Sequence, residues 1–174
     1  SALFLIGLGM IYGSVGSLNM TDVSRLIPTL DSDQHKLAIA GGLLLFVVFG
    51  IKAAMLPVGF WLPKTYAVAS TPVAAIFTIM TKMGIYAILR VNGTVFDDAL
   101  AQSIFKNTLL IIGLITSFYG VIGAIAAERL RRFVGFMVLS SIGTLLIAIA
   151  MFNTQAWSAA LYYLVHSTLV AAAF

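Results

Sequence analysis

Residues 52–66 of the chain, KAAMLPVGFWLPKTY, decide how the surrounding sequence folds. Pro57 and Pro63 each lack a backbone N–H donor, and Gly59 between them loosens the backbone. The stretch is nevertheless too apolar for a surface loop. Interrupted backbone at membrane depth survives only where protein or a water-filled cavity satisfies its polar groups. The stretch therefore predicts a transmembrane helix that is broken at Pro57–Pro63.

The composition of the whole chain indicates that this helix is one of several. Of the 174 residues, 61% are hydrophobic and only 9% are charged, whereas soluble domains carry roughly 25% charged residues. The mean hydropathy is +1.07, and residues 133–174 contain no Asp, Glu, Lys or Arg. A stretch of about 20 apolar residues spans a bilayer. The composition excludes an ordinary soluble domain and predicts an all-α polytopic membrane protein.

Several classes of chemistry are excluded by the same composition. The chain has no cysteine, so it has no disulfide framework, thiol nucleophile or cysteine-based metal site. Its formal net charge of +4 is carried by scattered residues and is accompanied by no glycine-rich phosphate loop, which argues against a nucleic-acid surface. We expect no cofactor, no bound metal and no nucleic-acid partner.

The polar residues divide the chain into six hydrophobic passages, which together form a bundle of about six transmembrane helices. The predicted passages are residues 2–18, the two halves 37–55 and 59–69 of the broken helix, 72–90, 107–127, 133–151 and 156–174. In the first polar connection, Thr21-Asp22 is expected to cap a short interfacial helix. In the connection at 91–106, Asn92-Gly93 is expected to form a turn and Asp97-Asp98 to lie in the first turn of a short helix.

Both ends of the chain lie inside apolar runs, at residues 2–12 and 171–174. A secretory signal would need a basic region before its apolar core, and only Ser1 precedes the first run. The sequence therefore predicts an internal segment of a larger membrane subunit, with residues 1–174 as a single transmembrane segment truncated at both ends.

The positive residues give a prediction of orientation. With alternating passages, Lys and Arg number four on each side of the membrane, so their count does not decide the matter. The shortest charged connection, residues 128–132, holds Arg129, Arg131 and Arg132. Because short connections follow the positive-inside rule most closely, we predict that 128–132 lies in the cytoplasm.

Three titratable side chains fall inside the predicted passages. Lys52 lies deep if its helix starts near residue 37, Lys82 lies about eleven residues into the next helix, and His166 is in the last passage. A lysine at a helix centre costs about 2.5–3.5 kcal/mol and by default marks an ion or proton path. We expect both lysines to face the bundle interior and to form a proton relay with His166. The residues alone leave two alternatives open: a lysine extending to the headgroups, and a neutral imidazole bonded to a neighbouring helix.

An ordered set of residues between positions 50 and 90 resembles a family signature. A lysine precedes a proline, a Trp-Leu-Pro follows, a proline opens the next helix, and a Lys-x-Gly-x-Tyr-x-x-x-Arg pattern ends the string. These residues are Lys52, Pro57, Trp61, Leu62, Pro63, Pro72, Lys82, Gly84, Tyr86 and Arg90. The pattern is similar to that of antiporter-like membrane subunits shared by Mrp-type multisubunit Na+/H+ antiporters and respiratory complex I. Residues 129–143, RLRRFVGFMVLSSIG, and 162–174, YYLVHSTLVAAAF, resemble later signatures of this family.

The resemblance implies an architecture and a set of roles. The passages would correspond to about the sixth through eleventh helices of a fourteen-helix subunit. Lys52 would pair with a glutamate on the fifth helix, while Lys82 would pass protons toward His166 and onward to a charged residue on the twelfth helix. Neither of these partners is present in the sequence. Many relatives have a lysine one turn beyond the histidine, where this chain has Val170, so the link beyond His166 is less polar here.

The resemblance also implies a function with two alternatives. The form of residues 136–143 and 166–170 is more similar to D-type subunits of Mrp antiporters than to complex I. We expect part of the proton-translocation pathway of a multisubunit monovalent cation (Na+)/H+ antiporter, a transporter subunit rather than an enzyme. Its partners would be other membrane subunits, protons, Na+ and the lipid of the cell (inner) membrane. The alternatives are a proton-pumping membrane-arm subunit of complex I, which would count as a translocase, and a scaffold subunit without transport.

Overall fold

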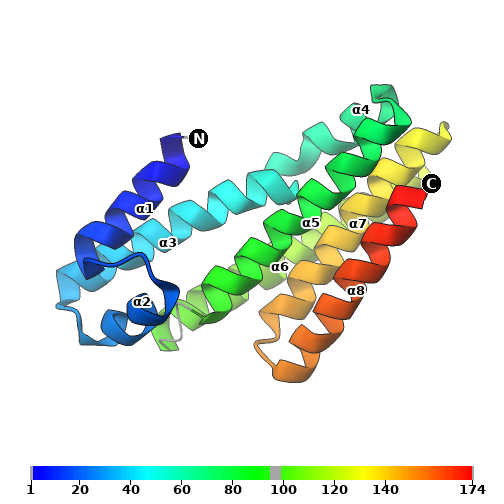
Figure 1. Ribbon diagram of the computed structural model, residues 1–174. Helices are drawn as coiled ribbons and strands as arrows, with labels where there is room; N and C mark the ends of the chain where they lie inside the picture. The colour runs from blue at the N-terminus through cyan, green and yellow to red at the C-terminus, as the bar shows by residue number, and fades with distance from the viewer. Residues whose placement is uncertain (1, 95–98, 174) are drawn as a thin grey trace. The chain divides into compact units, whose positions relative to one another are not determined.

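The computed structural model describes residues 2–94 and 99–173, and within these ranges the chain forms helices and short connections without a strand. The α-helices are α1 (Ala2–Val15), α2 (Met20–Leu26), α3 (Ser32–Ala53), α4 (Trp61–Val68), α5 (Thr71–Thr94), α6 (Ala99–Ile125), α7 (Leu130–Ala150) and α8 (Thr154–Ala173) (Figure 1). Two 3-10 helices, η1 (Ile27–Thr29) and η2 (Val58–Phe60), complete the described elements. The predicted all-α fold is confirmed.

The predicted number of membrane spans is also confirmed by the length and composition of the helices. Five described segments are long and apolar enough to cross a membrane: Ser32–Val68, Thr71–Val91, Ser103–Ile125, Leu130–Ala150 and Thr154–Ala173. A sixth is obtained if α1 and the following segment Met20–Thr29, bent by 53° relative to it, count as one span. These segments agree with the predicted passages except at their ends.

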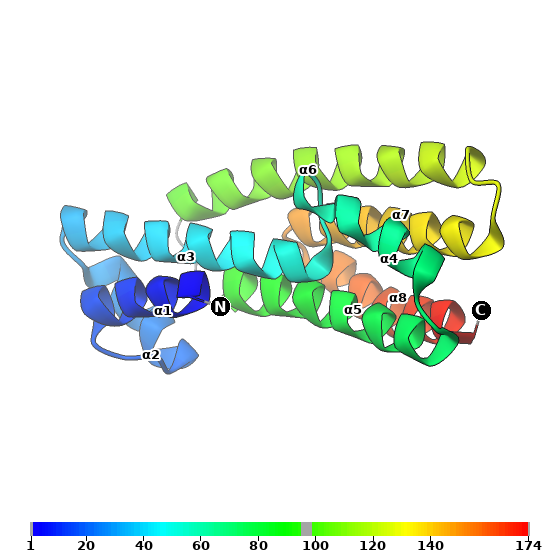
Figure 2. The same cartoon turned by 90° about the horizontal axis from the view of Figure 1, so that it is seen from above.

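The described residues cluster into two compact units. The first contains the residues up to Phe49 together with Tyr86–Phe105, and the second contains Gly50–Ile85 and the residues from Lys106 onward. In the second unit, α4 and α8 both pack against α7 (Figure 2). Lys52, Lys82 and His166 all belong to this second unit, so the candidate site is described within it.

The first unit begins with α1 packed closely on α3. A Cβ atom added at Gly41 would lie 3.0 Å from the carbonyl oxygen of Gly7, a separation that only small residues allow between membrane helices. The expected short helix before Pro28 is present as α2, but its N-cap is Asn19, whose side chain accepts a hydrogen bond from the backbone N–H of Thr21 at 3.3 Å. The predicted capping by Thr21-Asp22 is therefore wrong by two residues.

Three predicted boundaries are wrong because helices extend into polar sequence. α3 begins at Ser32, five residues before the expected start. α5 continues through Thr94, so Asn92-Gly93 forms no turn; the low helix propensity of these two residues is outweighed by the buried residues that precede them. α6 begins at Ala99 rather than at residue 107. Asp97 and Asp98 lie outside the described residues.

The broken helix is confirmed, and its free backbone groups are satisfied by protein. α3 ends at Ala53, and Ala54 takes a left-handed conformation with φ of 59°. The N–H of Leu56 donates a hydrogen bond to Thr116 Oγ1 of α6 at 3.1 Å, and Thr116 in turn donates to the carbonyl of Ile112 at 2.7 Å. A side-chain hydroxyl thus supplies the acceptor that interrupted backbone needs at membrane depth.

The three predicted hinge residues have different positions in the break. Pro57 immediately precedes η2. Gly59 leaves no room for a side chain, because an added Cβ atom would lie 2.0 Å from the carbonyl oxygen of Ala54. Pro63 lies in the first turn of α4, where its missing N–H leaves no helical hydrogen bond unmade. The break therefore ends at Trp61, before Pro63.

α6 and α7 approach each other through glycines, which fixes the position of α7. A Cβ atom added at Gly120 would lie 2.5 Å from the backbone nitrogen of Ser140, and one added at Gly143 would lie 2.4 Å from that of Ser117. Larger residues at either position would force the two backbones apart. This contact determines which residues of α7 remain available to the other helices of the unit.

The role of Thr116 at the break can be tested by removing its hydroxyl. Thr116→Val keeps the shape of the side chain but leaves the N–H of Leu56 without a partner, so we expect a loss of about 1–3 kcal/mol in unfolding free energy. The measurement is thermal unfolding of the complete subunit in detergent. Thr144→Val is the matched control, because the Thr144 hydroxyl also donates to its own helix, at 3.1 Å from the Ser140 carbonyl. Equal effects of the two substitutions would contradict the role of Thr116.

Candidate functional site

Lys82 is a buried lysine at the middle of a membrane span. It lies eleven residues after Thr71 in the span Thr71–Val91, and only 2% of its surface is exposed. Its ammonium Nζ donates a hydrogen bond to Ser141 Oγ of α7 at 2.5 Å, and it makes no other hydrogen bond or ion pair within residues 2–94 and 99–173. The prediction that Lys82 faces the bundle interior is confirmed, and the alternative that it extends to the headgroups is wrong.

Ser141 is suited to hold this ammonium because its hydroxyl hydrogen is used elsewhere. Ser141 Oγ donates to the carbonyl of Val138, one turn back on α7, at 2.7 Å. Its oxygen lone pairs remain free to accept from Lys82. α5 and α7 start at the same end of the unit (Figure 1), and each residue lies eleven positions into its helix. Both therefore lie about 16 Å from that end at 1.5 Å per residue.

Ser141 was not among the site residues predicted from the sequence. A pair of serines in a helix without any charged residue from position 133 onward was the available signal. The position of Ser141 would have strengthened this signal, because Ser141 and Lys82 each lie eleven residues after the start of their helices. Nothing in the sequence distinguishes Ser141 from Ser140, because the choice depends on which face of α7 lies toward α5.

Ser141 also borders a groove that contains His166. The groove has a volume of about 330 Å³ and is lined by residues of α7 and α8, among them Ser141, Tyr163, His166, Ser167 and Val170. Val170 makes this part of the groove apolar. Ser141 is therefore both the partner of the Lys82 ammonium and a lining residue of the groove.

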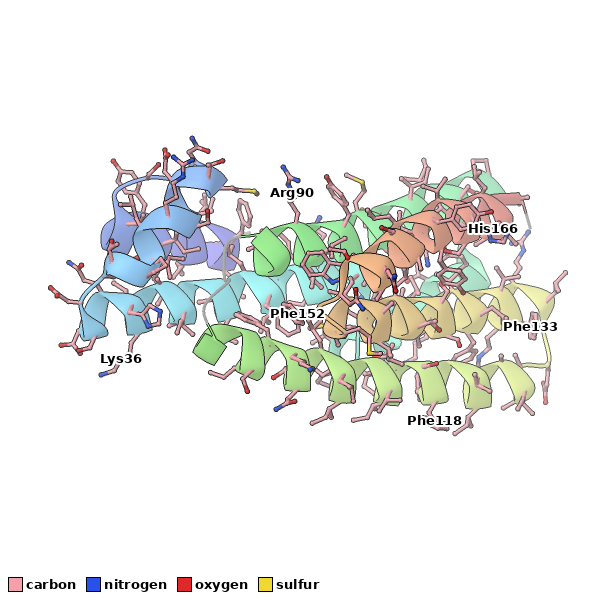
Figure 3. The ribbon with its side chains drawn as sticks, turned by 90° about the horizontal axis from the view of Figure 1, so that it is seen from below. Lys36, Arg90, Phe118, Phe133, Phe152 and His166 are labelled. Carbon is pink, nitrogen blue, oxygen red and sulfur yellow. The ribbon has the colours of Figure 1, made fainter. Side chains whose placement is uncertain are left out.

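His166 is exposed on α8 (Figure 3). Its ring stacks on that of Tyr162, with 6.4 Å between the ring centroids and an interplanar angle of 14°. In the part of the chain that the structure describes, the imidazole makes no hydrogen bond, so the alternative of an imidazole bonded to a neighbouring helix is not observed. No hydrogen bond joins His166 to Lys82 among the described residues, but His166 and Ser141, the partner of Lys82, line the same groove.

Lys52 lies at the end of α3, and its place in the predicted relay stays a prediction. It is the penultimate residue of α3, and its side chain is exposed rather than directed into the bundle. The buried residues at this end of α3 are instead those of the break, from Ala53 to Leu56. Across the described ranges, no hydrogen bond or ion pair joins Lys52 to Lys82. The structure therefore unites Lys82 with the groove of His166, but leaves Lys52 apart from them.

The chemistry available around Lys82 is that of an amine, hydroxyl groups and an imidazole. Among the residues that the structure describes, no three His, Asp or Glu side chains lie close enough together to hold a metal ion. A smaller groove of about 180 Å³ borders Lys82 and residues of α8, including Thr168. These groups can accept and release protons, and each can be a hydrogen-bond donor as well as an acceptor once the lysine is neutral.

Comparisons with known proteins agree on one family. Residues 1–174 match the profile of the family described as "NADH:quinone oxidoreductase/Mrp antiporter, TM". The D-type subunit of a "Probable K(+)/H(+) antiporter" of Rhizobium meliloti (strain 1021) is 43% identical over 176 residues, covering 100% of this chain and 33% of that protein. The D-type subunit of a Na(+)/H(+) antiporter of Bacillus subtilis (strain 168) is 36% identical over 172 residues, covering 98% of this chain and 34% of that protein.

Two solved structures resemble the fold. A chain of the Mrp complex from Dietzia sp. DQ12-45-1b has a TM-score of 0.87 and 30% identity, covering 99% of this chain and 31% of that one. A chain of the membrane-bound sulfane sulfur reductase, an archaeal respiratory membrane complex, has a TM-score of 0.86 at 22% identity, covering 98% and 34%; this second likeness shows the fold alone. The chain spans about a third of the length of the relatives that it matches.

The contact between Lys82 and Ser141 can be measured by a double-mutant cycle. Lys82→Met and Ser141→Ala should show a coupling free energy of about 0.6–2 kcal/mol, the range found for hydrogen bonds between membrane helices, in thermal unfolding of the complete subunit. Lys82→Met combined with Ser140→Ala, one residue away on α7, should show a coupling near zero. Additive effects of the first pair would mean that the two side chains do not interact.

Proposed function

This chain belongs to the transmembrane family of NADH:quinone oxidoreductase and Mrp antiporter subunits, and on that premise we propose that it forms part of the proton-translocation pathway of a multisubunit monovalent cation/H+ antiporter. The observation that carries the proposal is the buried Lys82 ammonium, bonded to the Ser141 hydroxyl halfway across the membrane spans. The names of the relatives that the chain matches support an antiporter over the complex I alternative.

The cost of Lys82 favours a role in proton transfer over a structural one. A lysine at the centre of a membrane helix costs about 2.5–3.5 kcal/mol. No carboxylate within the described ranges forms an ion pair with Lys82, and a single serine hydroxyl compensates the burial of the charge only in part. A structural polar group would be expected to be fully satisfied. A side chain that carries protons must exist in both charged and neutral forms. A single hydroxyl can form a hydrogen bond with either form.

Ser141 can stabilise either protonation state of Lys82. When the side chain is an ammonium, Ser141 Oγ accepts from it, as observed. When it is a neutral amine, the Ser141 hydroxyl can turn from the carbonyl of Val138 and donate to the amine nitrogen. A single hydroxyl therefore keeps Lys82 in place through a cycle of proton uptake and release.

We assign His166 to the step after Lys82. His166 and Ser141 line the same groove, and water in this groove would carry the proton from Lys82 at Ser141 to His166. An imidazole exchanges protons near neutral pH. Beyond His166 the groove is apolar at Val170, so the onward step depends on a group outside this chain.

We assign a modulating role to Lys52. Its exposed position on the described chain leaves its ammonium available to a carboxylate from the remaining two thirds of the subunit. On the same reading, the six passages correspond to about the sixth through eleventh helices of a fourteen-helix subunit. Approach of an acid to Lys52 would change the field at the bundle without direct contact with Lys82.

The cation, the partners and the orientation complete the proposal. One relative is named for K+ and another for Na+; we propose a monovalent cation, with Na+ the first to be tested. The partners are other membrane subunits of the antiporter in the cell membrane.

We place residues 128–132 in the cytoplasm. Arg131 supports this end of the bundle by donating to the carbonyl of Ala69 at 3.2 Å, and Arg132 lies 5.8 Å from the ring centre of Phe136.

Removal of the charge at position 82 tests the proposal directly. Lys82→Met in the complete complex should abolish cation-driven proton movement while assembly stays normal, because the apolar side chain fills the site but carries no proton. The assay is the change of a pH gradient in inverted membrane vesicles after addition of Na+ or, separately, K+. Lys106→Met is the control, because Lys106 is exposed on α6 and should tolerate the same substitution. Undiminished transport by an assembled Lys82→Met complex would refute the proposal.

A further inference from the structure

A second cavity lies at the end of the unit where the connections between α4 and α5 and between α6 and α7 are found. Its volume is about 190 Å³, and its lining includes Tyr66, Thr71, Ala74 and Arg131. Because it borders the exposed Thr71 and Arg131, it lies near the ends of the helices and not at mid-span. This cavity adjoins the groove of His166, because Leu130, Val134 and Ala171 line both, but its own residues Tyr66, Thr71 and Ala74 have no place in the function proposed above.

Two buried hydroxyl groups lead inward from this cavity. Tyr66 of α4 is 3% exposed and its hydroxyl is hydrogen-bonded to that of Thr78 on α5, which is 0% exposed. Thr78 Oγ1 also lies 3.2 Å from the carbonyl oxygen of Ala74, to which it can donate. The Thr78 hydroxyl therefore has two acceptors within reach and can alternate between them. Neither side chain is needed as a cap or an ion-pair partner.

Thr78 of this pair lies one helical turn before Lys82 on α5. Thr78 and Lys82 are four residues apart and share one face of the helix, with their Cβ atoms about 5–6 Å from each other. Both are buried on that face, together with Thr81. Counted from Thr71 at 1.5 Å per residue, Thr78 lies about 10 Å and Lys82 about 16 Å into the helix. The polar groups thus follow one another in order of depth.

We infer that the Tyr66–Thr78 hydroxyl pair is the entry step that delivers protons from the cavity at Arg131 to Lys82. The inference rests on the proposed function, because it requires Lys82 to be a proton carrier. It adds two positioning residues to the pathway and assigns the cavity as the opening through which water supplies the proton. The pathway then enters at Tyr66 and Thr78, reaches Lys82, and leaves it at Ser141.

The transfer balances with water as the proton source. A hydronium ion in the cavity gives a proton to the Tyr66 oxygen while the original Tyr66 O–H proton passes to Thr78 Oγ1. Thr78 releases its own proton to a water molecule, which passes a proton to the neutral amine of Lys82. The amine becomes an ammonium, and both hydroxyl groups are left with one proton each. The two hydroxyl groups then turn back to restore the starting hydrogen bonds.

The test uses hydroxyl-deleting variants in the complete complex. Tyr66→Phe and Thr78→Val should each slow cation-driven proton movement roughly 100-fold, the lower end of the range for a positioned proton-transfer group. The solvent deuterium isotope effect on this rate should rise in both variants, because proton entry becomes the slow step. Combining the two substitutions should slow transport no further than one of them alone, since both interrupt the same step.

Matched controls separate proton transfer from packing. Tyr119→Phe removes a tyrosine hydroxyl from α6, where the ring packs edge-on against Phe60 and Phe136, and should keep the wild-type rate. Thr78→Ser restores the hydroxyl and should recover most of the rate lost in Thr78→Val. If Tyr66→Phe does not assemble, the two Thr78 variants still give the comparison.

The outcomes distinguish this inference from the function on which it rests. Wild-type rates in Tyr66→Phe and Thr78→Val, with transport abolished in Lys82→Met, would overturn the entry step and leave the proposed function intact. A slow Thr78→Ser variant, as slow as Thr78→Val, would also overturn it, because a hydroxyl would then not suffice. Undiminished transport in Lys82→Met would overturn both.

Discussion

The burial of one lysine ammonium is the constraint on which the rest of the second unit depends. Lys82 lies at mid-span with 2% of its surface exposed, and in the described residues its charge is met only by the hydroxyl of Ser141. That hydroxyl must be held at the right depth, which requires α7 to lie at a fixed distance from its neighbours. Gly120 and Gly143 set this distance by letting α6 and α7 pack backbone to backbone.

One pattern of hydrogen bonding recurs at three buried sites. Thr116 accepts from the N–H of Leu56, Ser141 accepts from Lys82, and Thr78 is bonded to Tyr66. In each case the hydroxyl also donates, or can donate, to a carbonyl three or four residues back on its own helix. Burial of such a hydroxyl costs little free energy even without a partner on another helix, because a carbonyl of its own helix accepts its hydrogen bond. They act as acceptors for a neighbouring helix and make the broken segment and the buried charge tolerable at membrane depth.

The sequence predicts the features that depend on local residue patterns. It does not predict the features that depend on how the helices pack. Pro57 and Gly59 identified the break, and the position of Lys82 in an apolar run identified the buried charge. The turn at Asn92-Gly93 was wrong because packing of α5 overrides weak helix propensity. The exposure of Lys52 depends on which face of α3 its neighbours cover, and no local signal in the sequence specifies that face. Ser141 could not be chosen over Ser140, since a serine bonded to its own helix leaves no mark in the sequence.

The central claim is that Lys82 itself gains and loses a proton during transport. Lysine ¹⁵N resonances of the complete complex in lipid vesicles, with the Lys82 signal identified by its absence in Lys82→Met, measure this directly. The account predicts that the Lys82 signal changes between its ammonium and amine positions when a cation gradient drives proton movement. A Lys82 signal that stays at the ammonium position while protons are being moved would contradict it.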